Sequence, residues 1–259
     1  MPNIHPTAII HESATIDPTA KVGAYCMVGE QVSIGANTVL RSHVVVARFT
    51  RIGSGNDIFQ FASIGEDCQD LKYAGEETWL EIGDNNRIRE GCTIHRGTIQ
   101  DSGLTKIGDD NLLMVNSHIA HDCVVGSHNV IANNVAVAGH VHIGNHIIIG
   151  GNAGIHQFCQ VDDFSLIGGG SVVLKDVMAM TTVSGNPAKT HGLNLEGMRR
   201  KGWSKVTIQS LREAYKLIFR SGLTSQQAIS HLQQDLLPTE PKVQLLIDSL
   251  INSKRGIVR

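Results

Sequence analysis

The sequence is poor in aromatic residues and lacks any long apolar run. Trp, Tyr and Phe make up only 4% of the 259 residues, a composition that suits a thin core of stacked aliphatic side chains better than a large globular one. No stretch approaches the roughly twenty apolar residues that a membrane span needs. The N-terminus, Met-Pro-Asn-Ile-His, has neither the basic nor the apolar part of a secretory leader, so the sequence predicts a cytoplasmic protein.

What the sequence does contain is a six-residue repeat. Every sixth residue is aliphatic for eleven positions from Ile4 to Ile64, and the same frame returns for three positions from Ile82 to Ile94. After a shift of one residue it continues for twelve positions from Ile107 to Val173. This period is typical of a parallel β-helix, in which each short strand buries one aliphatic side chain and depends on its stacked neighbours.

The other repeat positions agree with a narrow interior. Counting the aliphatic residue as position one, position five is mostly small or β-branched, and position two is often glycine, as in Gly23 and Gly126, which we expect to form tight corners. Cys68 lies in an interruption of the repeat. The other four cysteines fall at position five, which predicts core residues rather than metal ligands or disulfide partners: Cys26, Cys92, Cys123 and Cys159.

The chain divides into a repeat region, 1–190, and a C-terminal region, 191–259, that is predicted to be helical. The repeat is interrupted at 66–81 and at 100–106. A solenoid tolerates insertions only where they project from its surface, and binding groups often lie on such loops. We therefore expect two surface loops on the β-helix.

One helix of the C-terminal region is predicted to begin after Ser204 and to stop at Gly222. Its apolar face carries Ile208, Leu211, Tyr215 and Ile218, and another face carries Lys205, Arg212, Lys216 and Arg220. Residues 197–220 hold seven basic side chains and one acidic one, in a chain of net charge −2. The basic face is either a solvated helix surface or a docking surface for an acidic partner. A nucleic-acid partner is disfavoured because aromatic residues are not interleaved with these charges.

Candidate chemistry is concentrated in the third part of the repeat. Three hexads make one coil of eighteen residues, so residues eighteen apart stack at about 4.8 Å. His121, Gly139 and Gln157 form one such column. A histidine followed by Asp122, with a glycine amide one coil above, is a candidate general base with an oxyanion donor. His118, His140 and His156 lie near this column. Outward polar residues on a solenoid surface are the simpler interpretation.

These residues lie within motifs that closely resemble the UDP-N-acetylglucosamine O-acyltransferases, which begin lipid A synthesis in Gram-negative bacteria. The resemblance covers the whole chain. Its motifs are SHVVV (42–46), QFASIGE (60–66), QDLKYAGE (69–76), TIHRGT (93–98), NLLMVNSHIAHDC (111–123), AGHV (138–141), HQFC (156–159), LNLEG (193–197) and AYKLIFRSG (214–222). The resemblance implies a mainly β fold, a left-handed parallel β-helix of hexapeptide repeats with a C-terminal α-helical domain. It also implies a homotrimer with active sites in clefts between subunits.

In that family pattern the protein would transfer a (3R)-3-hydroxyacyl group from acyl carrier protein to the 3-hydroxyl of UDP-N-acetylglucosamine. His121 would be the general base, Asp122 would orient it, and the Gly139 amide would be the oxyanion donor. No metal is implied, and no cofactor beyond the phosphopantetheine arm of the carrier. The acidic carrier protein suits the basic helix face.

The family pattern also assigns substrate contacts. The sugar would be held by His118, His140, Asp70 and Lys72, and the 3-hydroxyl of the acyl chain by Gln69. The nucleotide would meet His156, Gln157, Asn194, Glu196, Arg200 and Lys201, the last standing where arginine is often found. Gly169, stacked on Gly151 eighteen residues before it, matches the position that limits acyl length, and glycine there favours a longer chain.

Three alternatives remain open from the sequence. A trimeric hexapeptide-repeat zinc hydratase would also place histidines at a subunit interface. The related N-acyltransferase of lipid A synthesis uses the same donor. A solenoid used only for binding is the third, although it gives no reason for the column of His121 and Gly139.

Overall fold

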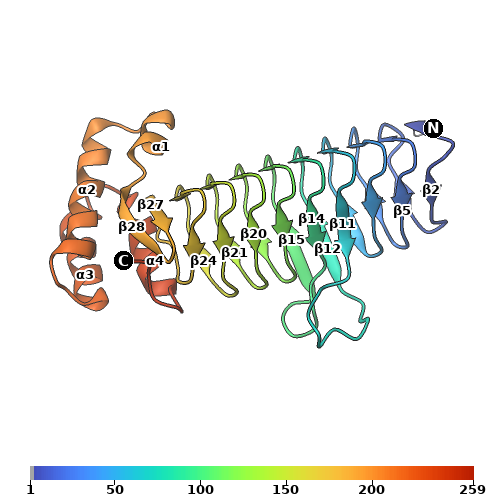
Figure 1. The fold of residues 1–259 in the computed structure, drawn as a ribbon. Coiled ribbons are helices and arrows are strands. Elements are labelled where there is room, and N and C mark those ends of the chain that lie inside the picture. The colour runs from blue at the N-terminus through green and yellow to red at the C-terminus, as the bar shows by residue number, and fades with distance from the viewer. Residues whose placement is uncertain (1–2) are drawn as a thin grey trace.

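A computed structural model of the chain describes residues 3–259 as an elongated solenoid capped by helices (Figure 1). The N-terminus lies at the free end of the solenoid, and the C-terminal helices cover the other end. Within the described residues, short parallel strands form three sheets that run the length of the solenoid. The helices and strands are numbered below as in Figure 1.

The three sheets are formed by every third strand in turn. The first sheet contains β1 (Asn3–Ile4), β4 (Lys21–Val22), β7 (Val39–Leu40), β10 (Asp57–Ile58), β13 (Arg87–Ile88), β16 (Leu112–Leu113), β19 (Val130–Ile131), β22 (Ile148–Ile149), β25 (Leu166–Ile167), β27 (Thr181–Gly185) and β28 (Ala188–Leu193). The second sheet contains β2 (Ile9–Ile10), β5 (Met27–Val28), β8 (Val45–Val46), β11 (Ser63–Glu66), β14 (Thr93–His95), β17 (His118–Ile119), β20 (Ala136–Val137), β23 (Gly154–Ile155) and β26 (Val172–Val173). The third sheet contains β3 (Thr15–Ile16), β6 (Ser33–Ile34), β9 (Thr50–Ile52), β12 (Trp79–Ile82), β15 (Leu104–Ile107), β18 (Val124–Val125), β21 (His142–Ile143) and β24 (Gln160–Val161).

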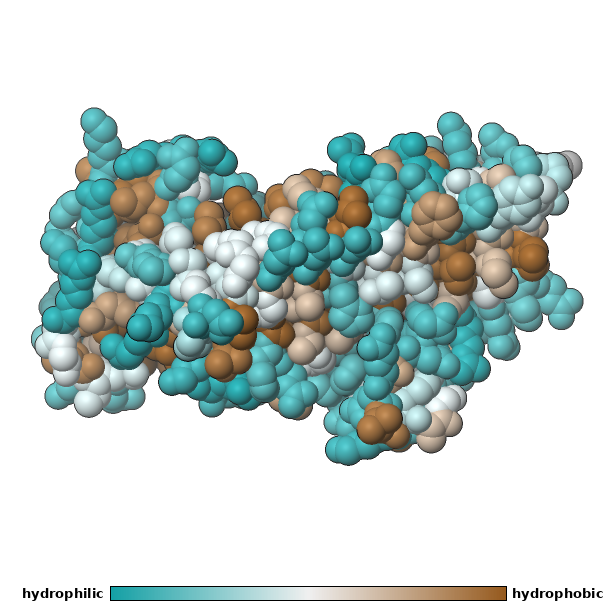
Figure 2. All heavy atoms as spheres, viewed as in Figure 1, coloured by the Kyte–Doolittle hydropathy of each residue, from teal (hydrophilic) through white to brown (hydrophobic). Residues whose placement is uncertain are grey.

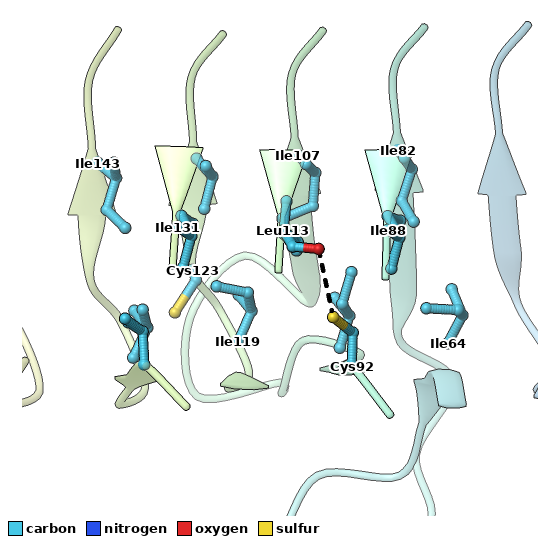
Figure 3. Close-up of a cluster of buried hydrophobic side chains, with 14 of the residues drawn as sticks. Ile64, Ile82, Ile88, Cys92, Ile107, Leu113, Ile119, Cys123, Ile131 and Ile143 are labelled. Carbon is cyan, nitrogen blue, oxygen red and sulfur yellow. Dashed lines mark hydrogen bonds between the residues drawn. The ribbon is translucent and has the colours of Figure 1, made fainter. Parts of the chain in front are cut away.

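The predicted coil of eighteen residues is confirmed by the strand pairing. His118 pairs with Ala136, which pairs in turn with Gly154. From Val22 to Val173 every aliphatic residue of the register is buried, and Figure 3 shows several of them stacked inside the coils. The four cysteines at position five are also buried, as predicted. The thiol of Cys92, for example, donates to the carbonyl of Leu113 in the interior.

The prediction that position-two glycines form the corners was wrong. From Tyr25 onward the left-handed backbone of the corners falls mostly at position four, for example at Tyr25 (φ 58°) and His140 (φ 60°). Gly23 at position two does not have a positive φ, but a Cβ there would lie 2.8 Å from the carbonyl carbon of Arg41 in the next coil. Glycine at position two is therefore required by the close stacking of coils, not by the turn itself.

Both predicted loops are present with shifted boundaries. The first insertion spans 67–78, because β11 continues to Glu66 and β12 begins at Trp79. The second spans 96–103, because β14 ends at His95 and β15 begins at Leu104. Trp79 pairs with Leu104 and Leu80 with Thr105, so the ends of the two insertions form strands against each other. Such pairing depends on a neighbouring coil and leaves no signal in the six-residue register.

After the last coil, β27 and β28 form an antiparallel hairpin, and β28 crosses the predicted boundary at 190/191. The helices are α1 (Leu195–Arg200), α2 (Lys205–Arg220), α3 (Ser225–His231), a π-helical turn η1 (Leu232–Leu236) and α4 (Val243–Asn252). Their apolar faces form a second core that includes Met180, Leu211 and Leu246. Among residues 3–259 no helix combines the length and apolar character that crossing a membrane would require.

The helix predicted between Ser204 and Gly222 is confirmed as α2. The Ser204 side chain accepts from the N–H of Thr207, and Gly222 has a φ of 74°. Ile208, Leu211 and Ile218 are buried on its inner face, but Tyr215 is only half-buried. The inner position is taken by Ala214, while Tyr215 stacks on Phe219. All four basic residues of the predicted basic face are exposed.

Candidate active site

His121 and Asp122 form a hydrogen-bonded pair at the corner that follows β17. Nδ1 of His121 lies 2.8 Å from Oδ2 of Asp122, whose side chain is completely buried. Thr98, from the second insertion, donates its N–H to Oδ1 (2.8 Å) and its hydroxyl to Oδ2 (2.6 Å). Burial alone raises the pKa of Asp122, but hydrogen bonds from His121 and Thr98 lower it, and the net shift is downward.

An ionised Asp122 selects the tautomer of His121. Because the carboxylate only accepts, Nδ1 of His121 carries the proton and Nε2 is left as the basic nitrogen. Among residues 3–259, Nε2 has no hydrogen-bond partner. The pair therefore has the arrangement of a general base with its orienting acid.

Gly139 lies directly against the imidazole of His121, one coil above it. The carbonyl of His121 accepts from the N–H of His140 at 3.0 Å, and the carbonyl of Gly139 accepts from Phe158 at 3.2 Å. A Cβ on Gly139 would lie 2.7 Å from both Cε1 and Nε2 of His121. Among the described residues 3–259, the N–H of Gly139 has no acceptor. It is therefore free to donate to a group held beside Nε2.

Three further histidines surround the pair. Nδ1 of His118 lies 2.7 Å from the hydroxyl of Thr93, and burial, with His121 nearby, lowers its pKa. His95 packs edge-on against His118 at 4.9 Å, and burial lowers its pKa to about 4. His95 is a neighbour that the spacing argument missed, because the second insertion, which follows it, shifts it out of the eighteen-residue column. In the sequence, only its place in the TIHRGT motif (93–98) pointed to a role for His95 in the site.

His140 is held between two rings and a carboxylate. It stacks on Phe158 at 4.5 Å and meets His121 edge-on at 5.0 Å. Its Nδ1 lies 3.1 Å from Oδ2 of Asp101, a residue of the second insertion that the sequence did not single out. No repeat position marks Asp101, since its contact depends on how the insertion folds back over the coils.

An apolar hollow of about 440 Å³ lies beside His118 on the outer face of the second sheet. It is lined by small or aliphatic residues such as Ala136, Gly154 and Val172, and by His156. Ala136 and Gly154 occupy the same strand position as His118 in the next two coils, so the absence of larger side chains there creates the space.

The predicted stacking of Gly151 and Gly169 is confirmed. The N–H of Gly170 donates to the carbonyl of Gly151 at 2.9 Å, which places the two corners one above the other. A Cβ on Gly169 would lie 3.2 Å from the Gly151 carbonyl oxygen, a tight contact. At Gly151 and Gly169 the surface is therefore formed by backbone atoms alone.

Within residues 3–259 the remaining predicted site residues form no hydrogen bond or ion pair with the central pair. Gln69, Asp70 and Lys72 lie on the first insertion, where the N–H of Lys72 donates to Oδ1 of Asp70 at 2.9 Å. Over residues 3–259, none of these three side chains forms a hydrogen bond or ion pair with His121 or Asp122. His156 and Gln157 are exposed one coil above Gly139.

The other four of the six predicted nucleotide contacts lie at the start of the helical region. Asn194 caps α1, its Oδ1 accepting from Gly197 at 2.9 Å and its Nδ2 donating to Phe164, so its amide is used within the chain. Glu196 pairs with Arg200 at 3.2 Å. Nζ of Lys201 lies 3.0 Å from Nδ1 of His146.

His121, Asp122 and His140 offer ligand atoms within 4.8 Å of one another and could be considered for a metal ion. However, Nδ1 of His121 and Oδ2 of Asp122 are hydrogen-bonded to each other, and Asp122 also accepts twice from Thr98. An ion between these atoms would have to replace that network. The donor set fits an oriented base better than a three-ligand metal centre.

Comparisons with known proteins match the whole chain. The sequence profile of domain 2 of UDP-N-acetylglucosamine O-acyltransferase matches residues 176–258, and that of bacterial transferase hexapeptide repeats matches 104–139. The acyl-[acyl-carrier-protein]–UDP-N-acetylglucosamine O-acyltransferase of Psychrobacter sp. (strain PRwf-1) is 72% identical over 259 residues, all of both chains.

Solved structures agree with this match. LpxA from Acinetobacter baumannii is 68% identical with a TM-score of 0.98, and the match covers 99% of this chain and 100% of that one. The UDP-N-acetylglucosamine O-acyltransferase of Moraxella catarrhalis is 66% identical with the same TM-score and coverage. The fold is a left-handed parallel β-helix with a C-terminal helical domain, as the resemblance implied. With full-length identity near 70% and a superimposable fold, the chain belongs to the acyl-[acyl-carrier-protein]–UDP-N-acetylglucosamine O-acyltransferase family.

Proposed function

We propose that this protein transfers a (3R)-3-hydroxyacyl group from acyl carrier protein to the 3-hydroxyl of UDP-N-acetylglucosamine, the first step of lipid A synthesis. The observation that carries the proposal is the base Nε2 of His121 lying beside the free N–H of Gly139. Full-length relatives at 72% and 69% identity bear the name of this activity. We place the reaction in the cytoplasm, as the sequence predicts.

In the proposed mechanism Nε2 of His121 accepts the proton of the sugar 3-hydroxyl as its oxygen attacks the thioester carbonyl. The negative charge that develops on the carbonyl oxygen is stabilised by the N–H of Gly139. Buried Asp122 stabilises the imidazolium. When the tetrahedral intermediate collapses, the C–S bond breaks and the imidazolium returns the proton to the thiolate of the phosphopantetheine arm. No metal or diffusible cofactor takes part in this scheme.

The substrate contacts proposed for the remaining residues come from the coils, the first insertion and the helical region. The sugar is assigned to His118, His140, Asp70 and Lys72, the acyl 3-hydroxyl to Gln69, and the nucleotide to His156, Gln157, Asn194, Glu196, Arg200 and Lys201. His118 and His140 lie beside the central pair. Because, over residues 3–259, the residues of the first insertion and of the helical region form no hydrogen bond with this pair, we propose a homotrimer with sites between subunits. Exposed apolar side chains on the solenoid, among them Ile9 and Met27 of the second sheet, support this assembly; Figure 2 shows such side chains interspersed with polar ones on one face. The acyl chain is assigned to the hollow beside His118. The limit on its length is assigned to Gly169, as the family pattern implies.

The direct test is to incubate the protein with UDP-N-acetylglucosamine and a mixture of 3-hydroxyacyl carrier proteins, and to identify products by mass. We expect one acylated sugar nucleotide whose mass also reports the preferred chain length. The related N-acyltransferase activity would leave UDP-N-acetylglucosamine unmodified.

The zinc hydratase is kept as the second candidate because of the three clustered ligand atoms of His121, Asp122 and His140. Metal analysis of the purified protein separates the two functions. Stoichiometric zinc would overturn the acyltransferase mechanism proposed here, and a solenoid used only for binding would yield neither zinc nor product.

The basic face of α2 is proposed to dock the acidic carrier protein. A hollow of about 320 Å³ on this face is lined by Arg212, Lys216, Arg220 and Tyr215. The double variant Arg212→Glu, Lys216→Glu is expected to raise KM for the carrier-bound donor roughly tenfold or more at low salt and less at high salt, because exposed charges are screened beyond about 10 Å at 0.1 M.

The matched control is Lys21→Glu, Arg87→Glu, which reverses two exposed charges on the first sheet of the solenoid. This variant should leave KM for the donor unchanged. Equal loss of donor affinity at low and high salt in the α2 variant would contradict electrostatic docking.

A further inference from the structure

Arg96, the first residue of the second insertion, is a buried cation that the proposed mechanism does not use. Its side chain is only 1% exposed. A buried charge costs several kcal/mol unless it is paired and hydrogen-bonded. The hydrogen bonds of this guanidinium therefore indicate its structural role.

Arg96 joins the first insertion to the solenoid. Nη1 donates to the carbonyl oxygens of Gly65 and Arg48, which belong to the coils. Nη2 donates to the carboxylate of Asp67 and, at 3.0 Å, to the hydroxyl of Tyr73, which both belong to the insertion. The planar fork of arginine is suited to bridging such a set, whereas lysine has no equivalent geometry.

Asp67 and Tyr73 reinforce each other. The Tyr73 hydroxyl lies 3.2 Å from Oδ1 of Asp67 and 3.1 Å from the carbonyl oxygen of Glu76. The guanidinium of Arg48 lies 3.5 Å from Asp67 on its outer side. Partial burial raises the pKa of Asp67, but Arg96, Tyr73 and Arg48 together lower it, so the net shift is downward and the carboxylate stays charged.

Asp67 and Tyr73, the two residues of the insertion that Arg96 binds, flank the residues assigned to substrate binding. Gln69, Asp70 and Lys72 lie between Asp67 and Tyr73 in the sequence, in a turn closed by the N–H of Tyr73 on the carbonyl of Asp70 (3.0 Å). Gln69 and Lys72 are exposed, so packing does not hold their side chains. Their positions depend on the backbone between the two anchors.

We propose that Arg96, together with Asp67 and Tyr73, is a clamp that holds the 69–72 turn in its substrate-binding arrangement before substrate arrives. The clamp consists of positioning residues and touches no substrate. The proposal rests on the proposed function in one respect, namely that the 69–72 turn contacts the sugar nucleotide and the acyl chain. A turn that is already ordered loses less conformational freedom on binding, which improves affinity.

The test uses Asp67→Asn and Tyr73→Phe, which alter the clamp without emptying the buried site of Arg96. The control is Asp57→Asn, which removes the carboxylate of the exposed Arg41–Asp57 pair on the first sheet. Amide hydrogen exchange of residues 67–78 and steady-state kinetics are measured on each full-length variant. In both clamp variants we expect exchange in this loop to accelerate at least tenfold. KM for UDP-N-acetylglucosamine should rise about tenfold with kcat within about twofold of the unmodified protein, as for loss of binding that is uniform along the reaction.

The outcomes separate the clamp from the activity. Unchanged exchange in both clamp variants overturns the clamp. Faster exchange with unchanged KM overturns its positioning role. A rise in KM for Asp57→Asn equal to that of Asp67→Asn would assign the effect to general loss of surface charge and overturn the proposal as well. If the unmodified protein transfers no acyl group, the proposed function fails, while the exchange data still decide whether the clamp exists.

Discussion

Replacing His121 with alanine is expected to abolish measurable acyl transfer, a loss in kcat of roughly 10²–10⁴-fold, while the solenoid stays folded. General-base catalysis by a positioned side chain contributes about this factor. The imidazole is held by a single hydrogen bond to Asp122 and is partly exposed, and the aliphatic residues of its coil, such as Ile119, are untouched by the change. The loss should therefore appear in activity and not in the thermal unfolding of the protein.

Asp122→Asn is expected to lower kcat by a similar factor, for a different physical reason. The carboxylate accepts from three donors, two from Thr98 and one from His121. An amide in the same place must present its NH₂ to at least one of them. If the NH₂ group faces His121, Nδ1 of His121 must become the acceptor. The proton of the imidazole then moves to Nε2, and the base is lost. If the NH₂ group faces the N–H of Thr98, two donors meet in a buried site and the pair is displaced.

Both variants are checked by kcat with carrier-bound donor and by circular dichroism of the purified protein. The control is His11→Ala, an exposed histidine in the N-terminal coils whose Nδ1 contacts only Ser13 within its own turn. It should retain full activity. A His121→Ala variant with normal kcat would remove His121 as the base.

The six-residue register predicted the coil because each strand is specified by its own residues. One aliphatic per hexad points into the coil, so the burial of Ile119 or Ile131, which have coils on both sides, can be predicted from spacing alone. The role of Gly23 could not, because its cause is the backbone of Arg41 one coil away. Where the structure depends on contacts between coils, as in the pairing of Trp79 with Leu104, the register carries no signal.

The same division applies to the site. His121 and Gly139 were placed together because they are eighteen residues apart in an uninterrupted stretch. Thr98, Asp101 and Arg96 reach the site through an insertion, and their contacts are set by how that insertion folds over the coils. Spacing cannot predict such contacts, so the residues that orient the base and hold the loop were visible only in three dimensions.

Gly139→Ala is the third substitution expected to have a large effect, with a fall in kcat of roughly 10²-fold or more. The added Cβ would lie 2.7 Å from Cε1 and Nε2 of His121, far closer than a van der Waals contact allows. The backbone of the coil is held by its ladder of hydrogen bonds, whereas the imidazole is the end of a side chain. The ring is therefore the part that moves, which breaks its hydrogen bond to Asp122 and shifts Nε2 from the substrate hydroxyl.

This substitution tests the position of the base separately from the oxyanion donor, because alanine keeps the backbone N–H that donates to the oxyanion. If displacement of His121 is the cause, Gly139→Ala should cost little in a His121→Ala background, so the two losses should not add. Full additivity would instead mean that the Cβ blocks the thioester or moves the N–H, in which case Gly139 acts on the acyl donor independently of the base. Normal kcat in the single variant would contradict the close packing of Gly139 against the imidazole, and with it the geometry on which the proposed mechanism depends.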